Sequence, residues 1–274
     1  LAFIERLIDA GVRRIEAASF VNPKRVPQMA DVDELVRRLP RRDGVRFIGL
    51  VLNRRGFERA AHSGIDQINC TTVASETFCQ RNQGASVGEM YAVIADIVRE
   101  AQATKMFCGV TIAASFGCPF EGEVAPARVR DMVRQFADLG VDEIALADSI
   151  GVAVPSDVRR LLELAGPVVG DIPLRVHFHD TRNTGVANVC AAVEAGVRII
   201  DASCGGVGGC PFAPGATGNV ATEDVLYVLQ RMGFATGIDI AKIIATTKWL
   251  EGPLGTAMPA MVSRAGVFPP AVTA

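Results

Sequence analysis

One kind of junction recurs along this chain: a helix-like stretch ends at a glycine, and Val or Ile then begins a run rich in β-formers. Glycine readily takes the left-handed conformation that follows a helix C-terminus. The junction occurs in IDAGVRRIEAASF, AHSGIDQINCTTV, ADLGVDEIALADSI and VEAGVRIIDASC, with the glycines at 11, 64, 140 and 196. Such regular alternation of helix and strand predicts a mainly parallel sheet that is buried on both faces.

Seven strands are predicted, with helices between them. The strands lie at 13–20, 45–52, 65–73, 106–116, 142–149, 174–180 and 198–204, and helices at 1–10, 32–41, 54–63, 87–103, 126–139, 155–164, 184–195, 222–232 and 239–250. The expected architecture is a single α/β domain over 1–274, a (β/α)8 TIM barrel in which 239–274 form a C-terminal helix and tail. An open doubly wound sheet is the alternative, but no glycine-rich dinucleotide loop follows the early strands.

An eight-stranded barrel needs one strand more than these seven. The chain begins at Leu1 without Met, and its first pattern is already a helix with no strand before it. We therefore expect the barrel to lack its first strand in this chain, and a natural N-terminal segment to carry it.

Composition narrows the classes of partner. Hydrophobic residues make up 49% of the 274 and charged residues 21%, as in a globular protein with a large core. A net charge of −2 gives no basic footprint for nucleic acid or a membrane surface. The longest uncharged runs are too short, or too often broken by Gly and Pro, to span a membrane. Seven cysteines without a C-x-x-C pair, and no leader pattern, favour the cytoplasm.

Two of the three histidines stand two residues apart in VHFHDT, at the end of a predicted strand. Residues i and i+2 of a strand share a face, so His177 and His179 are expected to project together. The carboxyl ends of barrel strands carry the active site. The pair is therefore a candidate metal site; the alternative is two polar side chains that close the barrel mouth.

The loop after the last predicted strand, DASCGGVGGCPFAPGATGN, is rich in glycine and holds Cys210 and Asn219. Glycines let backbone N–H groups approach a ligand closely, and anion sites in barrels often follow the last strands. A flexible linker is the alternative. The two reactive side chains, and the helix start that follows directly, favour a functional loop.

Two acidic residues lie near other strand ends. Glu16 stands where alternation would place an apolar inward side chain, and Asp148 ends the strand in ALADSIG. A carboxylate inside a barrel is costly unless it is paired, protonated or bound to a metal ion. Structural ion pairing and a place in the active site are both open for each. His62, by contrast, is expected near a helix C-terminus.

Long segments of the chain resemble 3-hydroxy-3-methylglutaryl-CoA lyase. They are IEAASFVNPKRVPQMAD, FGCPFEGEVAPARV, LADSIGVAVP, VHFHDT and SCGGVGGCPFAPGATGNVATEDVLYVL. The cysteine-containing glycine loop is specific to that family, whereas H-x-H is common to a wider metallolyase superfamily.

The resemblance implies a (β/α)8 barrel that binds Mg2+ or Mn2+ and catalyses retro-Claisen cleavage of a 3-hydroxyacyl-CoA. The products would be acetyl-CoA and a 3-oxo acid, acetoacetate from the named substrate. The ligand set without thiolate favours these ions over Zn2+. Homo-oligomers are common among such lyases and are expected here. The positions that match are, for the metal ion, His177, His179 and Asn219; for catalysis, Cys210, Glu16 and Asp148; and for the substrate, the adjacent Ser19 and Ser149.

Two departures from the family pattern matter. The family's first strand ends in an Arg–Asp pair that supplies a metal ligand and a catalytic cation, and this chain shows no such strand. In addition, TRNTG at 181–185 replaces an aromatic residue and a glycine. Arg182 there is a candidate to meet an extra carboxylate or a CoA phosphate, or else faces solvent. The acyl group is therefore open.

Two other functions remain as alternatives. One is a Claisen-condensing synthase of the same superfamily, which would need a longer C-terminal region than the short helix and tail found here. The other is a non-catalytic acyl-CoA-binding paralogue, which the absent first strand would suit.

Overall fold

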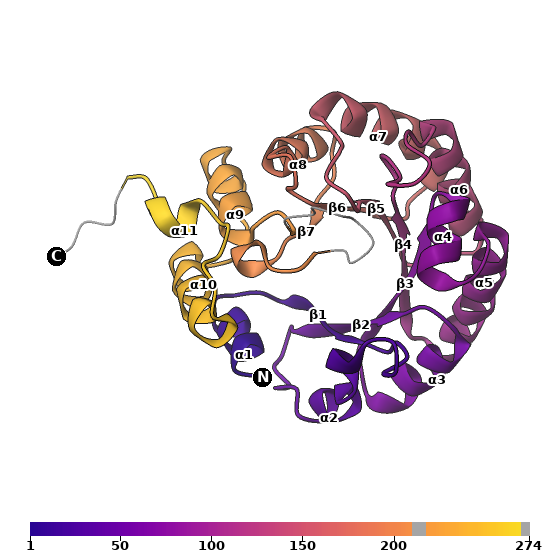
Figure 1. Cartoon of the computed structure of the whole chain (residues 1–274), viewed down its shortest axis with the longest axis horizontal. Helices are drawn as coiled ribbons and strands as arrows, with labels where there is room; N and C mark the ends of the chain where they lie inside the picture. Colours follow the sequence, from indigo (N-terminus) through magenta and orange to yellow (C-terminus); the bar gives the residue numbers. More distant parts are fainter. Residues whose placement is uncertain (210–217, 270–274) are drawn as a thin grey trace.

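A single parallel sheet of seven strands organises the computed structural model, which describes residues 1–209 and 218–269 (Figure 1). Its strands pair in chain order and curl into a barrel wall with the helices outside (Figure 1). This confirms the predicted α/β barrel architecture and the seven strands. They are β1 Arg14–Ser19, β2 Arg46–Val51, β3 Gln67–Val73, β4 Phe107–Ala113, β5 Glu143–Asp148, β6 Leu174–Phe178 and β7 Ile199–Asp201.

Two strands, β4 and β7, end three residues earlier than predicted, each for a local backbone reason. β4 stops at Ala113 because Ala114 adopts a left-handed conformation with φ of 55°. β7 stops at Asp201 and is followed by the 3-10 turn η2, Cys204–Gly206, in which Gly205 has φ of 70°. Residues 202–204 were therefore wrongly predicted as strand.

The predicted helices are all present, with shifted ends. They are α1 Ala2–Asp9, α2 Val32–Arg37, α3 Arg54–Ser63, α5 Val87–Thr104, α6 Pro126–Asp138, α7 Pro155–Val169, α8 Gly185–Glu194, α9 Thr222–Arg231 and α10 Ile240–Leu254. α7 runs past the predicted end because its buried stripe continues through Ala165 to Val169 in spite of Pro167. Besides η2, three elements were not predicted: η1 Pro27–Met29, α4 Glu76–Gln83 and α11 Val262–Ala265.

The two faces of the sheet differ in chemistry. Outward side chains such as Ile144, Leu146, Val176 and Phe178 have no exposed surface and join the apolar core beneath the helices. The inner face instead carries polar groups, including the buried Glu143, Asn69, Arg175 and His179. The barrel interior is therefore a polar layer inside an apolar shell, and the site is to be sought there.

The barrel wall does not close on itself, although the ring of helices does. β1 and β7 are the two edges of the sheet and do not pair with each other. Outside this opening α1 packs on α10 (Figure 1): Asp239 donates its N–H to the carbonyl of Ala10 at 2.7 Å, and the Arg6 guanidinium lies 4.6 Å from the Trp249 ring centre. Within the described ranges, no helix combines the length and apolar character needed to cross a membrane.

Glu223 joins the C-terminal helices to the turn after β7. Its carboxylate is fully buried and accepts hydrogen bonds from the N–H of Gly205 at 2.9 Å, from the hydroxyl of Thr247 at 2.6 Å, and from the hydroxyl of Ser263. These three donors belong to η2, α10 and α11. One carboxylate therefore fastens three separate segments at the base of the glycine-rich loop.

We predict that Glu223→Ala lowers the free energy of unfolding by about 3 kcal/mol, because three buried donors lose their acceptor. Urea unfolding followed by circular dichroism measures the change. Glu163→Ala, at an exposed position of α7, is the matched control and should cost less than about 0.5 kcal/mol. Equal effects of the two substitutions would contradict the assigned role of Glu223.

Candidate active site

The two histidines of VHFHDT lie together at the carboxyl end of β6, as predicted. Their ring centres are 5.3 Å apart. His177 pairs with Ala147 of β5 in the sheet, so its side chain shares the inner face of the barrel. His179 follows the last residue of β6 and forms an isolated bridge with Asn219. The chain thus returns from the glycine-rich loop to place an amide beside the imidazoles.

Two atoms of this group are buried without a hydrogen-bond partner among the described residues: Nδ1 of His179 and Oδ1 of Asn219. The orientation of the Asn219 amide is fixed, because its Nδ2 donates to the carbonyls of Val207 at 2.8 Å and Gly208 at 3.3 Å. A buried acceptor without a donor is costly and calls for a missing partner. A cation would be a suitable partner for both atoms.

The donor set fits a divalent ion. Burial, and secondarily the neighbouring His177, lowers the pKa of His179 to about 4, so its imidazole is neutral at neutral pH and keeps a lone pair. Two imidazoles and an amide oxygen form a mixed nitrogen and oxygen site. In the part of the chain that the structure describes, no group of three or more His, Cys, Asp and Glu side chains could hold a metal ion. The candidate metal site therefore requires the amide oxygen of Asn219 as a third ligand.

A carboxylate lies beside Nδ1 of His177. Oδ2 of Asp201, on β7, lies 3.3 Å from Nδ1 of His177 and also accepts from Nη1 of Arg175 at 2.6 Å. Burial alone would raise the pKa of Asp201, but Arg175 and His177 hold it well below its usual range. Asp201 is thus a carboxylate that bridges an arginine and a histidine.

Glu16 of β1 lies in the same interior, as predicted. Asn69 of β3 donates to its Oε2 at 3.3 Å. Part of the Glu16 side chain is solvent-accessible, since the barrel interior is open, yet its surroundings raise the pKa of its carboxyl: burial contributes most and the negative charge of Asp201 adds to it. Glu16 therefore holds a proton more readily than an ordinary glutamate.

Asp148 does not share this face. It pairs with Phe178 rather than with His177, and its carboxylate accepts the N–H groups of Val152 at 3.1 Å and Ala153 at 2.8 Å. Burial raises its pKa, while these backbone hydrogen bonds lower it in part. The contacts make Asp148 a support of the loop after β5, and the structure does not bring it together with the histidines.

The two serines differ in the same way. Ser149 is buried, and its Oγ accepts the N–H of Ala114, the residue in the left-handed conformation. Ser19, at the end of β1, is half-buried and has no side-chain hydrogen bond with the described residues. Ser19 is therefore the serine whose hydroxyl is available to a ligand. Cys210 lies outside the described residues.

The sequence does not by itself single out Arg175 and Asp201. A charged residue within the short strand sequences LRVHF and IID is the only signal, and it can equally mark an edge strand. Their role depends on pairing between β6 and β7, which places His177 opposite Asp201 and Arg175 opposite Ile199.

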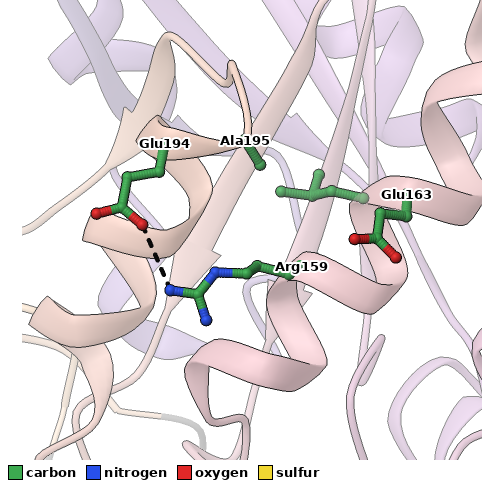
Figure 2. Close-up of a pocket in the computed structure, with 5 residues that line it drawn as sticks. Arg159, Glu163, Glu194 and Ala195 are labelled. Atoms are coloured by element: carbon green, nitrogen blue, oxygen red, sulfur yellow. Dashed lines mark hydrogen bonds and ion pairs between the residues drawn. The ribbon is translucent and has the colours of Figure 1, made fainter.

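Two surface cavities lie away from these groups. One, of about 320 Å³, lies between α7 and α8, where Arg159 and Glu194 form an ion pair at 3.4 Å (Figure 2). The other, of about 410 Å³, is lined by Glu76, Thr77, Gln80 and Arg81 of α4. Neither contains a residue of the candidate site, so chemistry rather than cavity size identifies the site.

Comparison with known proteins identifies the family of this chain. The model of the HMGL-like family matches residues 1–250. The chain belongs to this family. HMGL-like relatives include an (R)-citramalyl-CoA lyase from Chloroflexus aurantiacus, 42% identical over 98% of this chain and 89% of that protein, and a hydroxymethylglutaryl-CoA lyase from Pseudomonas mevalonii, 41% identical over 94% and 85%. The protein is therefore a carbon–carbon lyase.

Solved structures of HMGL-like lyases have the same fold. An HMG-CoA lyase from A. baumannii, in complex with coenzyme A and 3-methylmalate, superposes with a TM-score of 0.94 at 36% identity, covering 98% of this chain and 88% of that one. Hydroxymethylglutaryl-CoA lyase from Pseudomonas aeruginosa gives 0.92 at 36% identity, covering 96% and 88%.

The lowered pKa of His179 predicts a pH dependence of stability. Between about 6.5, the ordinary value, and about 4, the unfolded chain binds a proton at this residue that the folded chain does not. This contribution to stability is complete above pH 6.5 and is lost as the pH falls towards 4, with a slope of up to about 1.4 kcal/mol per pH unit.

The test is urea unfolding of the wild type and His179→Gln from pH 7 to 4. As the pH falls from 7 to 4, the wild type should lose stability relative to His179→Gln. His62→Gln is the matched control, because His62 is on the surface of α3. Parallel curves for the wild type and His179→Gln would contradict the burial of a neutral imidazole.

Proposed function

We propose that this HMGL-like protein is a lyase dependent on Mg2+ or Mn2+, which cleaves a branched 3-hydroxyacyl-CoA by a retro-Claisen reaction. With 3-hydroxy-3-methylglutaryl-CoA the products are acetyl-CoA and acetoacetate. The observation that carries the proposal is the group formed by His177, His179 and Asn219, in which two buried side-chain atoms lack a hydrogen-bond partner among the described residues.

A bound divalent ion would supply positive charge that lowers the pKa of the substrate's C3 hydroxyl and orients the carboxylate beside it. In this chain His177, His179 and Asn219 would hold that ion. The neutral imidazole of His179 and the fixed amide of Asn219 contribute no negative charge, so the ion's charge stays available to the substrate.

The reaction breaks one carbon–carbon bond and includes two proton transfers. The C3 hydroxyl passes its proton to a base, for which we propose the Glu16 carboxylate; its oxygen forms the new carbonyl, and the C2–C3 bond breaks with its electrons passing to C2. The resulting acetyl-CoA enolate then takes a proton at C2. We assign that proton to the thiol of Cys210, in the glycine-rich loop. Glu16, whose raised pKa favours proton exchange, remains a proposed catalytic residue, and Ser19 a proposed substrate contact. For Asp148 and Ser149, whose side chains accept backbone N–H groups of neighbouring loops, we propose that they assist catalysis and substrate binding by positioning those loops.

A second substrate has specific support. The Chloroflexus relative is an (R)-citramalyl-CoA lyase, and citramalyl-CoA has the same tertiary C3 hydroxyl with a carboxylate arm shorter by one methylene. Arg182 is at the rim where this sequence departs from the lyase pattern. Its Nη1 donates to the carbonyls of Ile150 and Gly151, both at 3.0 Å. This anchors the guanidinium near the loop after β5, where its other donors suit a substrate carboxylate.

The remaining expectations stay predictions: an acyl-CoA as the ligand, assembly into a homo-oligomer, and a cytoplasmic location. The CoA complex of the A. baumannii lyase supports the first of these.

A coupled assay of acetyl-CoA release tests the proposal. The full natural protein is incubated with MgCl2 or MnCl2 and with 3-hydroxy-3-methylglutaryl-CoA or (R)-citramalyl-CoA. We expect metal-dependent release from at least one substrate. Cys210→Ala should reduce kcat by about 10²-fold or more, whereas Cys190→Ala, on α8, should leave it unchanged. The absence of release from both substrates would instead favour an acyl-CoA-binding protein.

A further inference from the structure

Arg175 is a buried side chain of the barrel interior whose guanidinium contacts residues of three other strands. It is 3% exposed. Its Nε lies 2.8 Å from Oε1 of Glu143, Nη1 donates to Oδ2 of Asp201 at 2.6 Å, and Nη2 donates to Oδ1 of Asn69 at 3.0 Å. Nη1 and Nη2 thus donate to different acceptors, while Nε forms an ion pair with Glu143 that lacks hydrogen-bond geometry. Nothing in the proposed reaction uses this residue directly.

The Glu143 carboxylate that pairs with Arg175 also pairs with a second arginine. Arg14 of β1 contacts the same Glu143, with Nη1 at 2.5 Å from Oε2 and Nη2 at 3.1 Å from Oε1. Arg14, Glu143, Arg175 and Asp201 therefore form a chain of alternating charge that crosses the interior and ends beside the His177 imidazole. Such a chain favours a single position for Arg175, because moving it would leave the buried carboxylate of Glu143 and the half-buried carboxylate of Asp201 without this cation.

At the end of this chain, Asp201 determines which ring nitrogen of the neutral His177 carries the hydrogen. Oδ2 of Asp201 accepts from Arg175 and is the neighbour of Nδ1 of His177 at 3.3 Å. An ionised carboxylate can only accept hydrogen bonds, so Nδ1 must carry the hydrogen. The lone pair of the neutral ring is then on Nε2. The partner of one imidazole nitrogen decides which nitrogen is free to bind a metal ion.

We propose that Arg175 is a positioning residue: through Asp201 it holds His177 as the Nδ1–H tautomer and so prepares Nε2 as a metal ligand. The inference rests on the proposed function only in taking His177 as a ligand. A purely structural role for Arg175 would stabilise the barrel but leave the His177 tautomer as it is.

The first measurement reads the tautomer without metal or substrate. The chain has only three histidines, so 15N-histidine labelling and long-range 1H–15N correlation give a simple spectrum, which His177→Asn and His62→Gln serve to assign. In the wild type we expect Nδ1 of His177 to be protonated and Nε2 to be unprotonated. Arg175→Met should mix the two tautomers, and Arg175→Lys, which keeps a cation beside Asp201, should restore the wild-type form in part.

Asp201→Ala is the second variant, and it keeps the proposal testable if Arg175→Met does not fold. Oδ2 of Asp201 faces both Arg175 and Nδ1 of His177, so this substitution removes the acceptor that holds the hydrogen on Nδ1. The prediction is a mixture of the two tautomers. An unchanged His177 tautomer in a folded variant of either kind overturns the proposal.

The second measurement is calorimetric titration with MnCl2. Arg175→Met and Asp201→Ala should each weaken binding by about 10- to 100-fold, the usual cost of removing a partner behind a metal ligand. Arg159→Met is the matched control, because Arg159 pairs with Glu194 in the cleft between α7 and α8, outside the barrel (Figure 2). It should not change the affinity. Equal affinity in all three variants would show that Arg175 does not prepare the site.

The two measurements separate this inference from the proposed function. If the wild type releases no acetyl-CoA but its His177 has the expected tautomer and loses it in Arg175→Met, the proposed reaction fails and the positioning role stands. If the wild type is an active lyase, but neither its His177 tautomer nor its Mn2+ affinity depends on Arg175, the proposed reaction stands and the positioning role fails.

Discussion

The guanidinium of Arg175 lies among three acceptors contributed by different strands: Glu143 on β5, Asp201 on β7 and Asn69 on β3. A buried charge of this kind is tolerated only when its partners are all in place, and loss of one partner typically costs about 3–5 kcal/mol. The inner faces of three strands are therefore linked through one side chain. β7, with only three residues and no neighbour on its far side, depends on this link more than the longer strands do.

The polar residues of the barrel interior serve to orient the histidines at the carboxyl end of β6. Carboxylates and arginines of alternating sign fill the barrel below the histidines, while the apolar packing is confined to the space between strands and helices. Such a pattern contributes little net stability compared with an apolar filling. What it supplies is orientation, since each charged group restricts its neighbour, and the last group restricted is the His177 imidazole. The apolar shell supplies stability and the interior supplies geometry.

Periodicity and junction glycines predicted the strands and most helices of this barrel, because those signals are local. The same-face placement of His177 and His179 also followed from strand alternation and was confirmed. Asp148 was less predictable: its place at a strand end is local, but the direction of its side chain depends on register, which pairs it with Phe178 on the outer face. The bonds between Arg175 and Asp201 arise from pairing of β6 and β7, and no short sequence window contains that information.

We propose that the inner face at the end of β6 binds a divalent cation through His177, His179 and Asn219. A crystal of the natural protein grown with MnCl2, with data collected at the manganese edge, would reveal this ion. We predict one anomalous peak bonded to an imidazole nitrogen of each histidine and to Oδ1 of Asn219. A manganese ion bound elsewhere, or no peak beside these three side chains, would contradict it.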